Sequence, residues 1–169
     1  EREESSLSKE ELLKLWDEAV SQIYVLCQTE MAAKITERTL IGFRKDVKHN
    51  IKYDVKLLEE LKKSPEKIAK KIKQGKYWNK ECNEMKFDAV VGNPPYQEMA
   101  SGDANGSDPV YHFFIDASGV IGERATLIHP ARFLFNAGKT PKDWNKKILN
   151  NEHFKMIHYW PNSADVFPT

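Results

Sequence analysis

One stretch of the sequence permits few local structures, because an apolar run ends abruptly at two consecutive prolines. Residues 87–91 are mostly apolar and partly β-branched, and polar residues flank them, which predicts a buried strand of the parallel-sheet kind. Gly92, Asn93, Pro94 and Pro95 follow at once. Each proline lacks a backbone N–H and has a fixed φ, so neither a strand nor a helix continues through them. The sequence therefore predicts a rigid corner at the carboxyl end of a strand, where open α/β sheets place their ligands.

The corner carries groups that suit a planar ring with an amino substituent. The Asn93 side chain has an oxygen that accepts a hydrogen bond, and the Pro94 carbonyl is left outside any ladder. Each acceptor would take one hydrogen of an exocyclic NH₂ group, while Pro95 keeps the corner rigid and Tyr96 stacks on the ring. The structural alternative is a proline-rich turn that only closes a strand. It would require strand, glycine, asparagine, double proline and tyrosine to coincide by chance.

At these residues the sequence resembles a known family. Asn93-Pro94-Pro95-Tyr96 after an apolar strand looks like the catalytic motif of amino-group methyltransferases that use S-adenosylmethionine, above all the DNA adenine-N6 enzymes. The wider runs FDAVVGNPPYQ, VYHFFIDAS, ATLIHPARFL and HYWPNSADVF are similar to the Eco57I-like branch, the modification methylases of bacterial restriction systems. The resemblance covers the second half of the chain more fully than the first.

The resemblance implies an α/β class protein with a partial Rossmann-like methyltransferase fold, in which helices flank a mostly parallel sheet. It implies methyl transfer from S-adenosylmethionine to N6 of adenine, with Asn93, Pro94, Pro95 and Tyr96 as catalytic residues. The partner would be double-stranded DNA with a flipped adenine, together with a restriction endonuclease, fused or separate. Two other functions stay open. The same corner suits a protein-glutamine or RNA methyltransferase, and the chain could be a nucleic-acid-binding module without a cofactor.

Two acidic residues are candidates for cofactor binding. Residues 23–27 predict a strand, and Thr29 predicts the cap of a following helix, which together make half of a βαβ unit. The resemblance places an acid for the cofactor ribose near the end of this strand, and Glu30 is the candidate; a first-turn helix charge is its alternative role. Residues 50–54 predict a second strand. The resemblance sets its last residue, Asp54, against the adenine amino group of the cofactor, and an exposed strand end is the alternative.

The sequence contains no glycine-rich cofactor loop of the type Phe-x-Gly-x-Gly or Asp-Pro-x-x-Gly-x-Gly. In the family such a loop lets the methionine end of the cofactor approach the backbone closely. Target-recognition sequence is missing as well. We therefore expect residues 1–169 to be a partial methyltransferase catalytic domain, excised from a larger enzyme and inactive alone.

Local patterns predict the other elements. Residues 97–109, rich in Gly, Ser, Asp and Asn, predict a flexible loop. By resemblance, residues 132–135 lie near the target pocket and Tyr111 and His112 match a family segment, although core packing would explain the latter two equally well. The predicted elements are a helix from Ser8 to about Val20, two short helices between 57 and 73 divided at Ser64-Pro65, a helix at 110–120, a strand at 125–129, a helix at 143–149 and a strand at 155–160.

Composition excludes several classes of protein. Charged residues make up 30% of the chain, and no apolar run could span a bilayer, so we expect a soluble, cytoplasmic protein with no membrane partner. Cys27 and Cys82 are isolated and the five histidines are scattered, which predicts neither a disulfide nor a metal site. Residues 44–86 carry fourteen Lys or Arg against seven Asp or Glu. This excess favours a nearby phosphate backbone, or else a solvated helix face.

Overall fold

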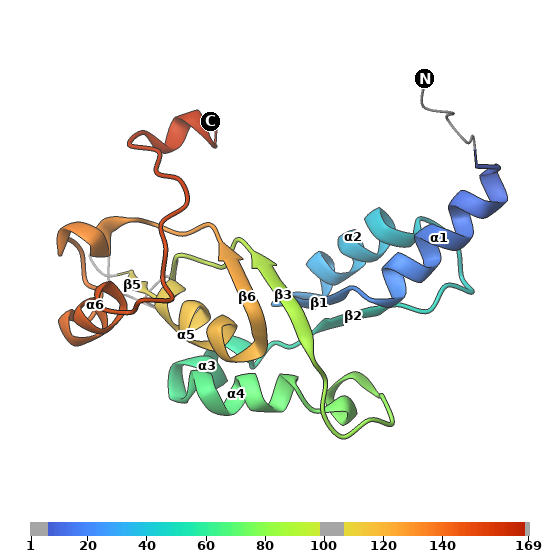
Figure 1. Ribbon diagram of the computed structural model, residues 1–169, viewed down its shortest axis with the longest axis horizontal. Coiled ribbons are helices and arrows are strands. Elements are labelled where there is room, and N and C mark those ends of the chain that lie inside the picture. Colours follow the sequence, from blue (N-terminus) through green and yellow to red (C-terminus); the bar gives the residue numbers. More distant parts are fainter. Residues whose placement is uncertain (1–6, 99–106, 168–169) are drawn as a thin grey trace. The chain divides into compact units, whose positions relative to one another are not determined.

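The computed structural model describes residues 7–98 and 107–167, and the chain divides into two compact units (Figure 1). Unit 1 is Glu1–Met85 and unit 2 is Lys86–Thr169. Helices alternate with parallel strand pairs in both units, so the α/β class expected from the sequence is confirmed. None of the helices in the described ranges has the length and apolar character needed to cross a membrane.

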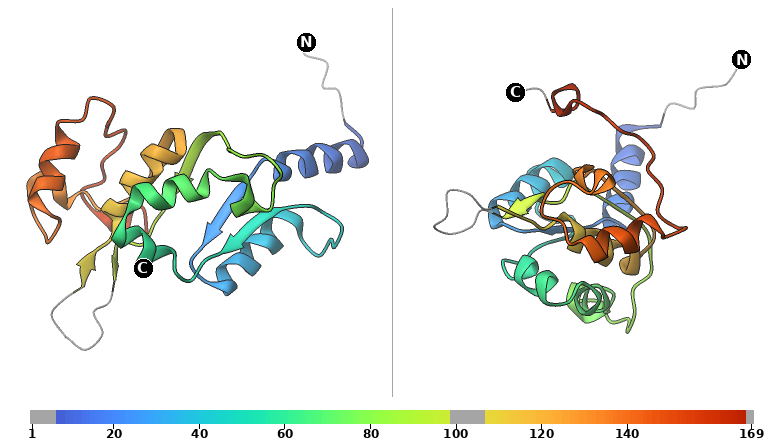
Figure 2. Two further views of the ribbon diagram at one scale, coloured as in Figure 1. Left: turned by 90° about the horizontal axis from the view of Figure 1, so that it is seen from below. Right: turned by 90° about the vertical axis from the view of Figure 1, so that its left-hand side faces the viewer.

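A βαβ element forms the centre of unit 1. Strand β1 (Tyr24–Cys27) leads into helix α2 (Glu30–Ile41), and strand β2 (Asn50–Tyr53) pairs in parallel with β1 along its whole length. The helix packs along both strands, as Figure 2 shows. Its start is fixed by Thr29, whose hydroxyl accepts a hydrogen bond from the Ala32 N–H at 3.1 Å. The predicted strand, helix and strand are therefore all present.

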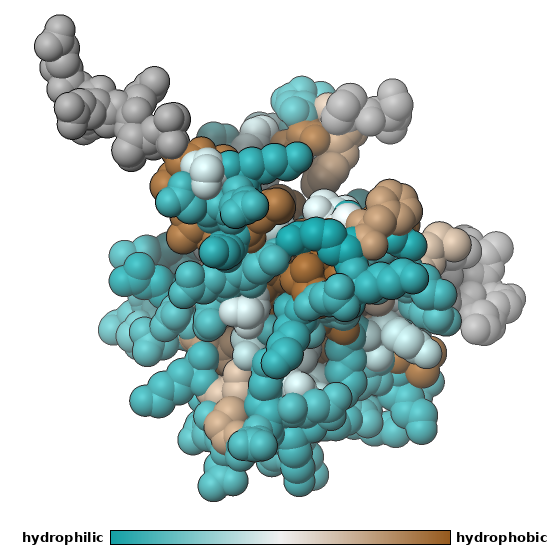
Figure 3. All heavy atoms as spheres, turned by 90° about the vertical axis from the view of Figure 1, so that its right-hand side faces the viewer, coloured by the Kyte–Doolittle hydropathy of each residue, from teal (hydrophilic) through white to brown (hydrophobic). Residues whose placement is uncertain are grey.

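Helix α1 (Lys9–Ser21) begins at the predicted cap. The Ser8 hydroxyl accepts from the Glu11 N–H at 3.3 Å, and the Glu11 carboxylate accepts from the Ser8 N–H at 2.8 Å, which completes a capping box. Much of its apolar face is exposed, including Leu12 at 53% and Trp16 at 48%. Figure 3 shows apolar residues in brown on a face that is otherwise mostly hydrophilic.

Two short helices and a 3₁₀ turn complete unit 1. Helix α3 (Leu57–Lys63) ends where α4 (Pro65–Ile72) begins, because Ser64 caps α4 by accepting from the Lys67 N–H at 3.4 Å. The predicted division at Ser64-Pro65 is confirmed. The turn η1 (Gly75–Trp78) follows, and the Tyr24 and Trp78 rings meet edge to face, with centroids 5.1 Å apart. The buried apolar residues of these three elements are Leu57, Leu58, Leu61, Ile68, Ala69, Ile72, Tyr77 and Trp78.

A second βαβ element forms the centre of unit 2. Strand β3 (Phe87–Gly92) pairs in parallel with β6 (Gly122–Leu127), and helix α5 (Tyr111–Ile121) packs against both strands (Figure 1). Between β3 and α5, the short strands β4 (Gln97–Glu98) and β5 (Asp108–Pro109) pair antiparallel. They flank residues 99–106 of the predicted loop, which lie outside the described residues.

Among the predictions for unit 2, two are wrong in part and one is wrong outright. Strand β6 starts at Gly122 and ends at Leu127, ahead of the predicted 125–129. No strand forms at residues 155–160, because no described strand pairs with this segment, and Ile157 is 79% exposed. Strand β3 is not buried throughout, since Val91 is 80% exposed. Full burial requires helices on both faces of a parallel sheet, whereas α5 is the helix that packs closely on β3 in the described part of unit 2.

Aromatic residues form the core of unit 2. The cluster joins α5 to the 3₁₀ turn η2 (Arg132–Phe135) and to helix α6 (Lys142–Leu149). Phe133 is 1% exposed and meets Trp144 edge to face, with ring centroids 5.4 Å apart. The Trp144 indole N–H donates to an Asp116 carboxylate oxygen at 3.0 Å, so its polar atom is satisfied.

We predict that Gly75→Ala destabilises the protein. A Cβ at this buried position would collide with the backbone carbonyl of Cys82, so the surrounding chain would have to shift. Overpacking of this kind costs about 1–3 kcal/mol. Denaturant unfolding of the variant measures the loss.

Gly119→Ala in α5 is the matched control for this prediction. A Cβ at Gly119 meets nothing within 4 Å, and alanine favours a helix by up to about 1 kcal/mol over glycine. The control should leave the free energy of unfolding unchanged or raise it. Equal effects in the two variants would contradict the steric argument.

Candidate active site

The corner after β3 is fixed at both of its ends by backbone hydrogen bonds. The Gly92 carbonyl accepts from the Ile128 N–H at 3.0 Å, and the Tyr96 carbonyl accepts from the Val110 N–H at 3.0 Å. Between these two points, the carbonyls of Asn93 and Pro94 have no backbone partner among the described residues. The corner is therefore anchored while its inner acceptors remain available.

Side chains of the corner are accessible in different degrees. Asn93 and Pro95 are exposed, whereas Pro94 and Tyr96 are half-buried. Burial raises the pKa of the Tyr96 hydroxyl, and a side-chain hydrogen bond with Asn93 opposes that rise. The amide and the phenol therefore lie together.

A cavity of about 220 Å³ lies beside Tyr96 within unit 2. Drug-sized ligands occupy pockets of roughly 300 Å³ or more, so this cavity suits a smaller group such as part of a nucleotide. Tyr96 is therefore at a cavity wall, and the ring is not enclosed in the core. The lining residues are Tyr96, Gln97, Ser107, Pro109, Tyr111, Pro130, Arg132, Gly138, Lys139 and Thr140.

The inner wall of the cavity is rigid. The Tyr111 and Thr140 hydroxyls share a hydrogen bond of 2.6 Å, and both residues are buried. On its other side Tyr111 stacks on His129, with ring centroids 5.9 Å apart and an interplanar angle of 5°. Of the two residues matched by resemblance, Tyr111 reaches the cavity, whereas His112 is buried against Phe113 and does not line it.

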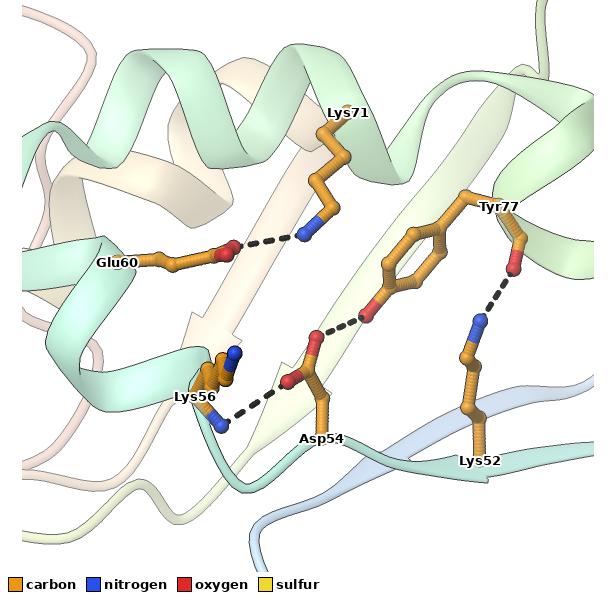
Figure 4. Close-up of polar contacts among 6 residues, drawn as sticks. All are labelled: Lys52, Asp54, Lys56, Glu60, Lys71 and Tyr77. Atoms are coloured by element: carbon orange, nitrogen blue, oxygen red, sulfur yellow. Dashed lines mark hydrogen bonds and ion pairs between the residues drawn. The ribbon is translucent and has the colours of Figure 1, made fainter.

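Asp54 lies where the sequence predicts it, directly after β2, and it is held by the protein itself (Figure 4). Its carboxylate accepts from the Tyr77 hydroxyl at 3.2 Å and from the Lys56 N–H at 3.0 Å. The Asp54 N–H donates to the Cys27 carbonyl at 2.9 Å, which ties it to the end of β1. Burial and the nearby Asp54 charge raise the pKa of Tyr77, so its hydroxyl stays protonated and donates. Each carboxylate oxygen keeps a further lone pair for a ligand.

Glu30 lies in the first turn of α2 and is exposed. Its carboxylate pairs with Lys34 one turn later at 3.0 Å, a contact that contributes little at such exposure. Because β1 and β2 are parallel, Glu30 and Asp54 both follow strand ends at the same edge of this sheet. Two carboxylates at this edge can accept hydrogen bonds from hydroxyl and amino groups.

Sequence reasoning missed several residues of the cavity. Lys139 and Thr140 follow a turn in which Gly138 has a φ of +86°, and no motif marks them. Gln97 and Ser107 come from the paired strand segment, where the Ser107 hydroxyl donates to the Gln97 amide oxygen at 2.9 Å. These residues meet only through tertiary structure, so no local pattern could identify them. Among the described residues no group of three or more His, Cys, Asp or Glu could hold a metal ion.

Comparison with known proteins points to one family. The model of the Eco57I restriction-modification methylase family matches residues 21–167. A Mycoplasma pneumoniae protein described as an uncharacterized adenine-specific methylase is 30% identical over 95 residues. The match covers 54% of this chain and 22% of that protein, so the chain spans well under two thirds of its length. No solved structure matches the chain.

We predict that the protein loses stability as the pH falls below about 6.5. Burial lowers the pKa of both His112 and His129 from the ordinary value of 6.5. Below that value the unfolded chain binds protons that the folded protein does not, so the free energy of unfolding falls. Thermal unfolding between about pH 7.5 and pH 5.5 should show the loss.

Replacing the two buried histidines tests the cause. His112→Asn and His129→Asn should each flatten the pH dependence, whereas replacement of the exposed His153 by Asn should not. An unchanged pH dependence in both buried-site variants would refute the assignment.

Proposed function

The chain belongs to the Eco57I restriction-modification methylase family, and on this premise we propose that it methylates adenine in double-stranded DNA. The methyl donor is S-adenosylmethionine, the acceptor atom is N6, and the enzyme is the modification component that protects DNA from a restriction endonuclease. The observation that carries this proposal is the corner after β3, which is fixed at both ends, leaves the Pro94 carbonyl without a backbone partner among the described residues, and sets the Asn93 amide beside Tyr96. An adenine-specific name for the Mycoplasma pneumoniae relative supports the same substrate.

Asn93 and Pro94 have the central role in this proposal. The amino nitrogen of adenine is a poor nucleophile, because its lone pair is delocalised into the ring. The Asn93 side-chain oxygen and the Pro94 carbonyl each accept one amino hydrogen, which draws the nitrogen toward tetrahedral geometry. Both acceptors also stabilise the positive charge that develops on the nitrogen during attack. No general base has to act before transfer, since the proton leaves a nitrogen that is already cationic.

Tyr96 and the cavity beside it hold the adenine after extrusion from the duplex. Enzymes that act on a base take it out of the stack and place it in a pocket between aromatic side chains. Stacking on one aromatic ring contributes roughly 1–3 kcal/mol, which offsets part of the extrusion cost. Pro95 keeps the ring and the acceptors in fixed relation.

Asp54 and Glu30 would hold the cofactor at the carboxyl edge of the β1–β2 sheet. The free lone pairs of Asp54 fit the adenine amino group of S-adenosylmethionine, and Glu30 fits the ribose hydroxyls. When bound, the cofactor supplies an electrophilic methyl group. The 169 residues carry no glycine-rich loop for its methionine end. We therefore propose that another segment of a longer enzyme provides this loop, and that residues 1–169 alone bind the cofactor weakly and are inactive.

Asn93→Ala in the intact enzyme should lower the turnover of DNA methylation by at least about 10²-fold, the usual cost of one lost charge-stabilising contact. DNA binding should change little, because the amide contributes mainly in the transition state. Mass spectrometry of digested DNA measures N6-methyladenine, and protection of plasmid from restriction gives a second readout. Asn93→Asp keeps an acceptor oxygen, so it should retain more activity than the alanine variant.

Two results would contradict this proposal. If the Asn93→Ala variant turned over at a rate close to wild type, the Asn93 amide would have no catalytic role. A wild-type enzyme that methylates RNA or protein glutamine, but leaves plasmid DNA unmodified, would exclude DNA as the substrate.

Asp54→Asn should weaken binding of S-adenosylmethionine to the intact enzyme by about 10-fold or more, since it removes the charge of a hydrogen-bonded acceptor. The variant keeps an oxygen for the Lys56 N–H, so the loop should still fold. Glu30→Gln should weaken binding as well. Glu37→Gln, also on α2, is the matched control and should bind like wild type. Calorimetry measures each affinity, and equal affinities in all variants would exclude this cofactor site.

A further inference from the structure

We propose that Arg132 and Lys139 form a phosphate-binding subsite at the cavity beside Tyr96, and that the ligand is a phosphodiester of the nucleic acid strand that carries the target base. The inference rests on the proposed function, since it places a nucleic acid at this cavity. It adds two residues that bind the backbone of the substrate and do not touch the reacting atoms.

Charge at the cavity favours an anion. Two cations line it, and none of the described lining residues is a carboxylate. Arg132 has no ion-pair partner among the described residues. Burial raises the pKa of the Tyr111 hydroxyl, and the Arg132 charge opposes that rise, so the guanidinium lies near Tyr111. Lys139 pairs with Asp108 at 3.8 Å, but both side chains are more than half exposed. A contact this long and exposed is weak, so a phosphate can replace it.

The backbone holds Arg132 in a defined position. The next residue, Phe133, is 1% exposed in the core of unit 2, which anchors η2. The chain then turns back through Asn136 at a φ of 53° and Gly138 at a φ of +86°. A Cβ at Gly138 would lie 3.7 Å from the Arg132 Cδ, so the arginine stem rests against this glycine. A stem supported in this way loses less freedom when the guanidinium binds phosphate.

The groups at the cavity match parts of one nucleotide. Tyr96 provides an aromatic wall for a base, and the two cations line the same cavity of about 220 Å³. One sugar separates a base from its phosphate, so both groups can be bound here together. The buried hydroxyl pair of Tyr111 and Thr140 supplies further polar atoms to this wall. Arginine and lysine beside a stacking aromatic are the usual elements of single-strand recognition.

The salt dependence of DNA binding tests the subsite in the intact enzyme. Each phosphate contact contributes about 1 to the slope of log affinity against log salt concentration. Because both cations bind the same phosphodiester, the Arg132→Gln, Lys139→Gln double variant should lower the slope by about 1 on a short duplex oligonucleotide, and each single variant should lower it by part of that amount. Arg132→Lys keeps the charge and should keep the slope. Lys146→Gln and Lys155→Gln remove exposed cations outside the cavity and should also leave it unchanged.

A neutral methylphosphonate in place of one phosphate beside the target adenine identifies the ligand. The substitution should weaken binding to the wild-type enzyme and cause no further loss in the Arg132→Gln, Lys139→Gln double variant. If inorganic phosphate binds the wild type but the methylphosphonate duplex binds normally, the cavity takes a free anion and the proposal is overturned. Equal slopes in wild type and both glutamine variants overturn it too.

Failure of the subsite can be told apart from failure of the proposed function. Loss of the subsite should raise the KM for DNA and leave kcat nearly unchanged, whereas Asn93→Ala should lower kcat and keep the wild-type salt slope. A wild-type enzyme that binds DNA with the expected slope but methylates nothing would reject the function and leave the subsite. Normal methylation with no change of slope in either glutamine variant would reject the subsite alone.

Discussion

Two backbone hydrogen bonds fix both ends of a corner whose two prolines provide no backbone donor. Gly92 is bound by the Ile128 N–H and Tyr96 by the Val110 N–H, each at 3.0 Å. Pro94 and Pro95 remove the donors that would otherwise engage neighbouring carbonyls. The carbonyls of Asn93 and Pro94 between the two anchors therefore have no backbone partner among the described residues.

Parallel pairing of the strands explains why the candidate site residues lie at one edge of each sheet. In unit 2 the pairing of β3 with β6 sets Ile128 beside Gly92, so the strand that follows α5 completes the corner. In unit 1 the pairing of β1 with β2 sets Asp54 beside Cys27 in the same way. Each unit thus carries acceptors just beyond a pair of strand ends, and each set arises from one βαβ element.

The features that could be predicted from the sequence are those set by residues close together in the chain. The caps at Thr29 and Ser64, the double proline and the acid after β2 act within a few residues, so their positions could be predicted. Burial of β3 could not be predicted, because the exposure of Val91 depends on which helices cover the sheet. The position of Lys139 at the cavity could not be predicted either, because it depends on how η2 and the following turn fold.

A hydrogen bond to a tyrosine side chain holds each of the two polar side chains, Asp54 and Asn93, in place. Asp54 accepts from the Tyr77 hydroxyl, and Asn93 forms a side-chain hydrogen bond with Tyr96. An acceptor already held by its own protein loses less conformational freedom when a ligand arrives, so more of the contact energy appears as affinity. Tyr77 donates to Asp54, and burial raises the pKa of its phenol, so it stays protonated. At Tyr96 burial also raises the pKa, but the Asn93 amide N–H donates to the phenol oxygen and opposes that rise, so the amide oxygen is not used by this bond. The two tyrosines therefore do more than pack the protein, since each holds a polar side chain in place and leaves lone pairs for substrate or cofactor.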